Sequence, residues 1–241
     1  MEIVLVRHAQ PDWEPDGRAV DEPGLTVYGH RQAECAARCL AGDRFDHFYV
    51  SPFRRAVETA APIAKALGME PVQQSWLREM GLPSLEGQTS EQVQAYFEQA
   101  HARELDHWWD GLPGGESFRH FYERVSGGLE GLLAGMHGVR IHEDAGHRLW
   151  RLDDAPARIL IVAHEGTNAV LLSHLLGIEP VPWAPMRFSN SWAGITRIHS
   201  LEIAGGWLWS LESFNRVSHL DALVDGHPGD GRSPTLIDPA P

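Results

Sequence analysis

The chain contains few cysteines and lysines, and it has no long hydrophobic run. Only two cysteines occur in 241 residues, Cys35 and Cys39, which argues against a small secreted fold stapled by disulfides. The 20 basic residues include a single lysine, Lys65, and all the others are arginines. The abundance of arginine therefore reflects a bias in the composition of this chain, so only the position of an arginine can indicate a binding site.

Export, membrane insertion and nucleic-acid binding are also disfavoured by what is missing. The apolar runs are too short to cross a bilayer, and the N-terminus lacks the pattern of an export signal. We therefore expect a soluble, cytoplasmic protein without a membrane partner. The formal net charge is −13, whereas nucleic-acid binding depends on concentrated Lys and Arg, so no nucleic-acid partner is expected. The oligomeric state stays open.

The order of the apolar segments predicts an α/β fold. Helices should run from Thr26 to about Leu40, within "SPFRRAVETAAPIAKALG", and within "EGTNAVLLSHLLG". Strands are expected at residues 2–7, "FDHFYVS", "EPVQQ" and "RILIVAH", and as an antiparallel pair near 194–203 and 207–213. This alternation predicts a three-layer α/β/α sandwich with a mainly parallel central sheet.

The middle of the chain reads as an insertion over the strand ends of a single domain. Over about residues 78–157 the pattern loosens, with helices expected near 90–104 and 116–135 and then a polar loop. Residues 1–220 should form the domain, and residues 221–241, rich in Pro, Gly and Asp, a mobile tail. Most tryptophans should fill the core, but Trp108 or Trp109 could wall a pocket in the insertion.

Polar side chains follow three of the predicted strands where each strand ends. Arg7 and His8 end the first strand, Ser51 ends the second, and His164 follows "RILIVA". In such sheets ligands bind outside the carboxyl ends of the strands, so these side chains should meet at one rim. Glu79, in the stretch after the weak third strand, should lie in the same neighbourhood.

Two imidazoles, several arginines and one carboxylate are suited to phosphoryl transfer. A neutral imidazole can attack phosphorus, and the guanidinium groups of Arg7 and of Arg54 or Arg55 match phosphate oxygens. The Glu79 carboxyl group can protonate a leaving oxygen and later accept a proton from water. A lone histidine at a strand end is usually an ordinary polar residue, so the argument depends on the convergence.

Eight segments resemble motifs of the histidine phosphatase superfamily, the phosphoglycerate-mutase-like proteins. They cover about residues 2–220 in the family's order and read "VLVRHAQPDW", "LTVYGHRQA", "SPFRRAVETA", "LREMGLPSLEGQ", "PGGESF", "ILIVAHEG", "RFSNSWAGITRI" and "SFNRVSHL". The resemblance implies a catalytic set of His8, Glu79 and His164, with His8 as nucleophile and Glu79 as general acid and base. It further implies that Arg7, Arg55 and His164 bind the phosphoryl group, without a metal or another cofactor.

The same resemblance implies a phosphatase that hydrolyses phosphate monoesters of small metabolites through a phosphohistidine. Two positions depart from the family pattern. Glu14 stands where mutases of the family usually have asparagine, which favours a phosphatase over a mutase. Glu165 stands where glycine normally follows the second histidine, and we predict that it shapes the choice of substrate.

Three alternatives remain open. The chain could be a phosphoglycerate-mutase-like phosphotransferase, or a non-catalytic protein that binds phosphate ligands on the same fold. A zinc hydrolase is the third, because "HEDAGH" offers His142, Glu143, Asp144 and His147 as ligands. These histidines are five apart instead of four apart on one helical face, so a solvated loop is expected there.

Overall fold

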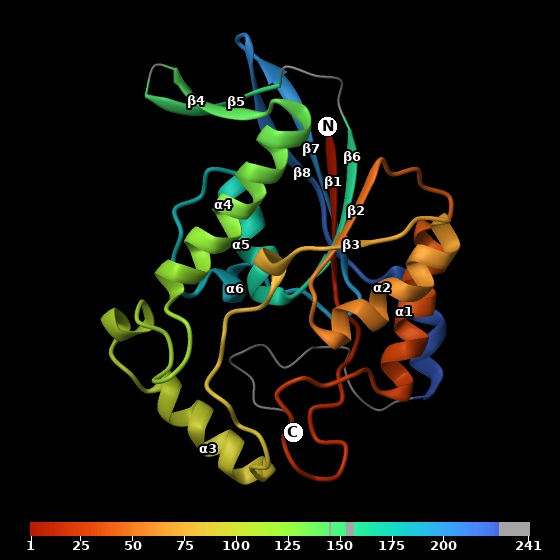
Figure 1. Ribbon diagram of the computed structural model, residues 1–241, viewed down its shortest axis with the longest axis vertical. Helices are drawn as coiled ribbons and strands as arrows, with labels where there is room; N and C mark the ends of the chain where they lie inside the picture. The colour runs from red at the N-terminus through yellow and green to blue at the C-terminus, as the bar shows by residue number, and fades with distance from the viewer. Residues whose placement is uncertain (145, 153–156, 227–241) are drawn as a thin grey trace.

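The computed structural model describes residues 1–144, 146–152 and 157–226, which are built around one eight-stranded sheet. The strand order is β3-β2-β6-β1-β7-β8-β5-β4 (Figure 1). The strands are β1 (Glu2–Arg7), β2 (His47–Val50), β3 (Val72–Gln73), β4 (Arg140–Asp144), β5 (His147–Arg151), β6 (Arg158–Ala163), β7 (Ile195–Ile203) and β8 (Gly206–Arg216). Every strand expected from the sequence is present, and β4 and β5 are additional.

The expectation of a mainly parallel sheet is wrong. Only the pairs β3–β2, β2–β6 and β6–β1 are parallel, and the remaining four neighbouring pairs are antiparallel. The difference comes from the segment read as a polar loop, which forms β4 and β5 and extends the sheet beyond β8. Trp150 is the one buried residue in these two strands, so they carry little of the apolar signal that marks a strand.

The helices form close to where the sequence places them. Thr26 caps α1 by accepting a hydrogen bond from the Gly29 amide, and Gly68 ends α2 in the left-handed conformation at φ 65°. The α-helices are α1 (Val27–Leu40), α2 (Arg54–Leu67), α3 (Ser90–His101), α4 (Phe118–His137), α5 (Glu165–Leu175) and α6 (Ala184–Arg187). The short 3₁₀ helices are η1 (Ser75–Leu77), η2 (Leu105–Trp108) and η3 (Ser218–Gly226). Among the helices described, none is long and apolar enough to cross a bilayer.

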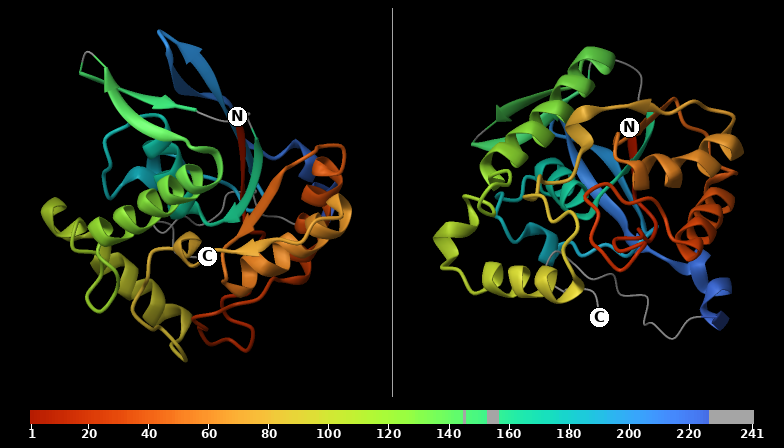
Figure 2. Two further views of the ribbon diagram at one scale, coloured as in Figure 1. Left: turned by 45° about the horizontal axis from the view of Figure 1, so that its top comes forward. Right: turned by 60° about the horizontal axis from the view of Figure 1, so that its bottom comes forward.

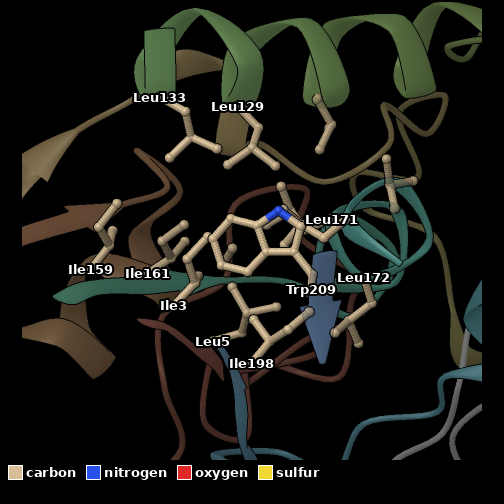
Figure 3. Close-up of a cluster of buried hydrophobic side chains, with 14 of the residues drawn as sticks. Ile3, Leu5, Leu129, Leu133, Ile159, Ile161, Leu171, Leu172, Ile198 and Trp209 are labelled. Atoms are coloured by element: carbon tan, nitrogen blue, oxygen red, sulfur yellow. The ribbon is translucent and has the colours of Figure 1, made fainter. Parts of the chain in front are cut away.

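Successive side chains of the central strands enter two different apolar clusters. Ile3, Leu5, Ile159 and Ile161 pack with residues of α4 and α5, whereas Val4, Val6, Leu160 and Val162 pack with residues of α1 and α2. In Figure 3 the Trp209 ring lies between the strands and Leu129 of α4. Full burial of one such side chain contributes about 1.5–3 kcal/mol, so the packing on both faces stabilises β1 and β6 at the centre of the sheet.

The region expected as an insertion divides into unlike parts. α3 lies away from the sheet in both views of Figure 2, whereas Val125, Leu129 and Leu133 of α4 belong to the core. η3 covers the first residues of the segment expected as a tail: it extends to Gly226, contacts α1 and buries Leu223. The rest of the expected tail, residues 227–241, lies outside the described residues.

Candidate active site

Three neighbouring parallel strands bring the predicted histidines together. The His8 amide donates to the Ala163 carbonyl at 2.9 Å, so the ends of β1 and β6 lie side by side, and Ser51 follows β2 next to them. The ring centroids of His8 and His164 are 5.1 Å apart. Their residues are 3% and 0% exposed, so both rings are buried. The convergence expected from the strand order is therefore present.

His8 has a defined tautomer and no charge. Its Nδ1 atom lies 2.8 Å from the Ala9 carbonyl oxygen. A carbonyl oxygen can only accept, so Nδ1 carries the proton and Nε2 keeps a free lone pair. Burial, and then the positive charges of Arg55 and Arg7, hold the pKa of His8 well below 6.5. The ring is thus a neutral imidazole with Nε2 available as a nucleophile.

Two buried arginines beside His8 have unused hydrogen-bond donors. Arg7 donates through Nη1 to the Asn190 carbonyl, but its Nε atom has no partner among the described residues. Nε and Nη1 of Arg55 are likewise unpaired within the described part of the chain. Burial lowers the pKa of Arg55 to about 10, so it remains a cation at neutral pH. Buried donors without partners are costly unless a ligand satisfies them, and these match an anion.

The Arg55 guanidinium is held by aromatic rings instead of by carboxylates. Its Cζ atom lies 5.0 Å from the ring centroid of Trp13 and 4.9 Å from that of Phe53. Such contacts fix a cation in place without occupying its N–H groups. Arg54, the neighbouring candidate, is exposed and pairs with Glu58 at 2.7 Å, so Arg55 is the arginine at the site.

His164 is neutral and also has an unused ring nitrogen. Nε2 lies 2.7 Å from the Ser51 hydroxyl oxygen, and Nδ1 is buried with no partner in the described residues. Burial lowers the pKa of His164 well below 6.5, and the charge of Arg55 adds to the shift. When the Ser51 hydroxyl donates to Nε2, the proton of the neutral ring is on Nδ1, which can then donate to a bound oxyanion.

Glu79 is held by two backbone amides. Its Oε1 accepts from the Met80 amide and its Oε2 from the Gly166 amide, both at 2.9 Å. Burial raises the pKa of Glu79 above 4.5, although the two amides and the nearby arginines oppose the shift. A Cβ atom on Gly166 would lie 2.5 Å from Oε1, so the first turn of α5 requires glycine there. A carboxyl group with a raised pKa can donate a proton and recover it.

Arg124 of α4 fixes the segment that carries Glu79, and sequence reasoning missed it. Its guanidinium donates to the carbonyl oxygens of Trp76, Arg78 and Glu79 at 2.9, 3.1 and 3.3 Å. It also pairs with Glu116 at 2.7 Å, and Glu116 accepts from the Gly81 amide. Of the two residues in this ion pair, Glu116 stood in the motif "PGGESF", whereas Arg124 stood in no motif, so nothing in the sequence marked it. Ser51 and Asn190 were likewise not assigned contacts.

The Glu165 carboxylate contacts the protein's own Arg7. Its Oε2 lies 3.2 Å from Nη1 of Arg7, and its Oε1 accepts from the Asn190 amide at 3.1 Å and the Ser189 hydroxyl at 3.2 Å. Burial raises the pKa of Glu165, and the charge of Arg7 opposes the shift. The buried acid therefore offsets part of the positive charge at the site.

Other residues singled out in the sequence lie elsewhere. Trp108 lines an apolar pocket, whereas Trp109 packs edge-on against Phe118 in the core. Glu14 accepts a hydrogen bond from the exposed Ser90 hydroxyl at 2.5 Å. In the "HEDAGH" segment, His142, Glu143 and Asp144 lie in β4 and His147 lies in β5, and residue 145 lies outside the described residues. Within the part of the chain that is described, no three His, Cys, Asp or Glu side chains are grouped to hold a metal ion.

Comparisons with known proteins find similar sequences and similar structures. The probable phosphoglycerate mutase GpmB of Serratia proteamaculans is 28% identical over 226 residues, covering 92% of this chain and 95% of that protein. Phosphoserine phosphatase 1 of Hydrogenobacter thermophilus is 33% identical over 134 residues, covering 54% of this chain and 63% of that protein. A mycobacterial glucosyl-3-phosphoglycerate phosphatase has a similar structure, with a TM-score of 0.67, 25% identity, and coverage of 90% and 99% of the two chains. The family model of the histidine phosphatase superfamily (branch 1) matches residues 3–215, so the chain belongs to that superfamily.

Proposed function

We propose that this protein is a metal-independent phosphatase that hydrolyses phosphate monoesters of small metabolites through a phosphohistidine on His8. The observation that carries the proposal is a neutral imidazole with Nε2 free, next to buried arginine donors that have no partner among the described residues. Arg7, Arg55 and His164 bind the phosphoryl group, and Glu79 is the general acid and base.

In the first half-reaction Nε2 of His8 attacks phosphorus in line with the leaving oxygen. The N–P bond forms as the P–O bond to the alcohol breaks, and Glu79 transfers its proton to the leaving oxygen. The proton on Nδ1 stays in its hydrogen bond to the Ala9 carbonyl. Donors from Arg7, Arg55 and His164 offset the charge on the phosphoryl oxygens in the transition state.

In the second half-reaction water replaces the alcohol. The Glu79 carboxylate accepts a proton from water as the water oxygen attacks phosphorus. The N–P bond breaks, its electron pair returns to Nε2 of His8, and inorganic phosphate leaves. Glu79 is again protonated, so the cycle closes without another reactant. The raised pKa of Glu79 supports this double role.

A phosphoglycerate-mutase-like phosphotransferase is the second candidate, supported by the nearly full-length similarity to a probable phosphoglycerate mutase. A phosphoglycerate also carries a carboxylate that needs a cation. Around this site Arg7 is paired with Glu165, Arg124 with Glu116 and Arg54 with Glu58. Because these arginines already pair with carboxylates of the protein, they are not free to bind the carboxylate of a phosphoglycerate. This favours the phosphatase.

Further expectations from the sequence belong with the proposal. The two apolar clusters on opposite faces of the sheet support a three-layer α/β/α architecture. The family match to residues 3–215 supports residues 1–220 as one domain. The small phosphorylated metabolite as substrate is supported by the printed names of the relatives. The cytoplasmic location stays a prediction from the sequence.

The decisive experiment measures phosphate release from a panel of phosphate monoesters in the presence of a chelator. We expect turnover by the wild type, loss of turnover in His8→Ala, and normal turnover in His30→Ala, whose imidazole is 56% exposed. Quenching with labelled ester should trap an acid-labile, base-stable phosphoenzyme in the wild type only. Wild-type rates in His8→Ala would remove His8 from the mechanism. Interconversion of phosphoglycerates with little free phosphate would favour the mutase. Loss of phosphate release on addition of the chelator would favour a zinc hydrolase.

A further inference from the structure

An apolar pocket lies next to the segment that carries Glu79. It is formed by the residues after Glu79, by α3 and η2, and by the segment that enters α6. Its apolar lining includes Met80, Leu82, Phe97, Trp108, Pro182 and Met186. Nothing in the phosphoryl-transfer steps uses these side chains, so the pocket needs an explanation of its own.

The polar groups that line this pocket are already engaged. Arg103 donates through Nε to the Ala100 carbonyl at 2.9 Å and through Nη1 to the Gly111 carbonyl. The imidazole of His101 stacks on the ring of Trp108, with 6.0 Å between the centroids. Most of the lining is apolar, so a charged ligand group placed here would lose water to apolar side chains, and burying such a group is costly. The pocket therefore suits an uncharged apolar group.

The pocket and the general acid share two residues. Met80 and Gly166 line the pocket, and their amides hold Oε1 and Oε2 of Glu79. The leaving oxygen must come within hydrogen-bond reach of that carboxyl group to receive its proton. The rest of the leaving alcohol is attached to this oxygen, so the pocket adjoins the group that the leaving alcohol must approach.

We infer that this pocket binds the alcohol part of the substrate, and that the preferred substrates are phosphate monoesters of alcohols with an uncharged aromatic or other apolar group. The inference rests on the proposed function and names its substrate class. Apolar contact at the pocket stabilises binding in proportion to the area removed from water. The small polar alcohol of phosphoserine or glycerol phosphate leaves the pocket unfilled.

Two esters with the same kind of leaving group provide the test. Benzyl phosphate and glycerol 1-phosphate both release a primary alcohol, so they differ mainly in the group that would enter the pocket. We expect kcat/KM of the wild type to be at least about tenfold higher for benzyl phosphate, the scale of discrimination by an apolar pocket.

Met186 offers a variant at the pocket that leaves the phosphate-binding residues untouched. It is 41% exposed, and Leu201 on β7, which is 45% exposed and is not part of the pocket, is the matched control. Met186→Asp should reduce the preference for benzyl phosphate at least about tenfold, because it places a charge beside the apolar group. Leu201→Asp should keep the preference, and inhibition by inorganic phosphate should be unchanged in both variants.

The outcomes separate this inference from the proposed function. Equal kcat/KM for the two esters, a preference for glycerol 1-phosphate, or an equal loss for both esters in Met186→Asp would overturn the inference alone. Absence of phosphate release from every ester would overturn the proposed function, and the inference with it. A preference for benzyl phosphate that falls only in Met186→Asp would support both.

Discussion

The two ends of the same parallel strands carry charged clusters of opposite kinds. At the amino ends Glu2 pairs with Arg158 at 2.5 Å and with Arg197 at 2.8 Å, while Asp43 pairs with the same two arginines at 3.2 and 2.6 Å. We call these four residues the amino-end cluster. Each of its arginines lies between two carboxylates, so its charges are satisfied within the protein.

The cluster at the carboxyl ends is incomplete without a ligand. Buried atoms of Arg7, Arg55 and His164 lack hydrogen-bond partners within the described chain, and the His8 ring is held neutral by burial and by neighbouring cations. Natural proteins seldom leave buried donors unpaired, and the exceptions need an explanation. Charge that the protein satisfies itself serves stability, whereas charge left unsatisfied in a buried site indicates function.

The largest effect that would test this comparison comes from Arg55. Arg55→Met should lower kcat/KM about 10²- to 10³-fold, the usual loss when one preorganised donor to a transition-state oxyanion is removed. The free energy of unfolding should not fall, because the variant removes a buried cation that forms no ion pair with a carboxylate of the described residues. Steady-state kinetics and urea unfolding measure the two effects. Loss of stability without loss of activity would contradict the functional assignment.

The matched change at the other end should give the reverse result. Arg197→Met breaks pairs with Glu2 and Asp43 and should lower the free energy of unfolding by about 2 kcal/mol, between the values for exposed and buried pairs. The kcat/KM of the folded protein should stay at the wild-type value. Urea unfolding followed by assays well below the melting temperature would show this. A drop in kcat/KM as large as that of Arg55→Met would erase the contrast between the two ends.

The carboxyl-end site could largely be predicted from the sequence, for a local reason. The runs "IVLV" and "ILIV" are buried on both faces, so their strand character is unmistakable, and β1, β6 and β2 are parallel neighbours. Residues that follow such strands must meet at one edge. The positions of Arg7, His8 and His164 therefore follow from strand order alone.

The remaining features depend on tertiary contacts that no local pattern encodes. β4 and β5 form an exposed pair with mostly polar side chains, so their strands look like a loop. Arg124 supports Glu79 from a helix 45 residues away in the chain. The partner of Glu165 depends on the direction in which Arg7 leaves β1, and a sequence specifies this only once the fold is formed.

A smaller effect is expected at Glu165, the carboxylate that pairs with Arg7 at the carboxyl-end site. Glu165→Gln keeps an acceptor for the Asn190 amide and the Ser189 hydroxyl but removes the charge that offsets Arg7. Inorganic phosphate should therefore inhibit the variant about fivefold more tightly, a modest share of the interaction between two unit charges at this distance. The inhibition constant measures this effect.

The exposed Glu14 provides the control for that measurement, since Glu14→Gln removes a carboxylate outside the buried pair. Weaker inhibition in Glu165→Gln would mean that Glu165 orients Arg7 more than it offsets its charge. The prediction that Glu165 shapes substrate choice is separate. An unchanged ranking of esters in Glu165→Gly would contradict it.

The smallest effects are pH dependences of opposite sign at the two ends. Burial alone would raise the pKa of Glu2, but the pairs with Arg158 and Arg197 hold it below 4.5. The stability that Glu2 contributes is therefore present above pH 4.5 and is lost as the pH falls through its folded pKa. Burial raises the pKa of Glu79, so its contribution is present below pH 4.5 and is lost as the pH rises through its folded pKa.

Urea unfolding of the wild type, Glu2→Gln and Glu79→Gln over about pH 3 to 7 measures both slopes. The advantage of the wild type over Glu2→Gln should grow with pH, because ion pairs lower the pKa of Glu2, and its advantage over Glu79→Gln should shrink, because burial raises the pKa of Glu79. Slopes of the same sign would show that folding shifts the pKa of both carboxylates in the same direction, which would contradict the difference between the two ends.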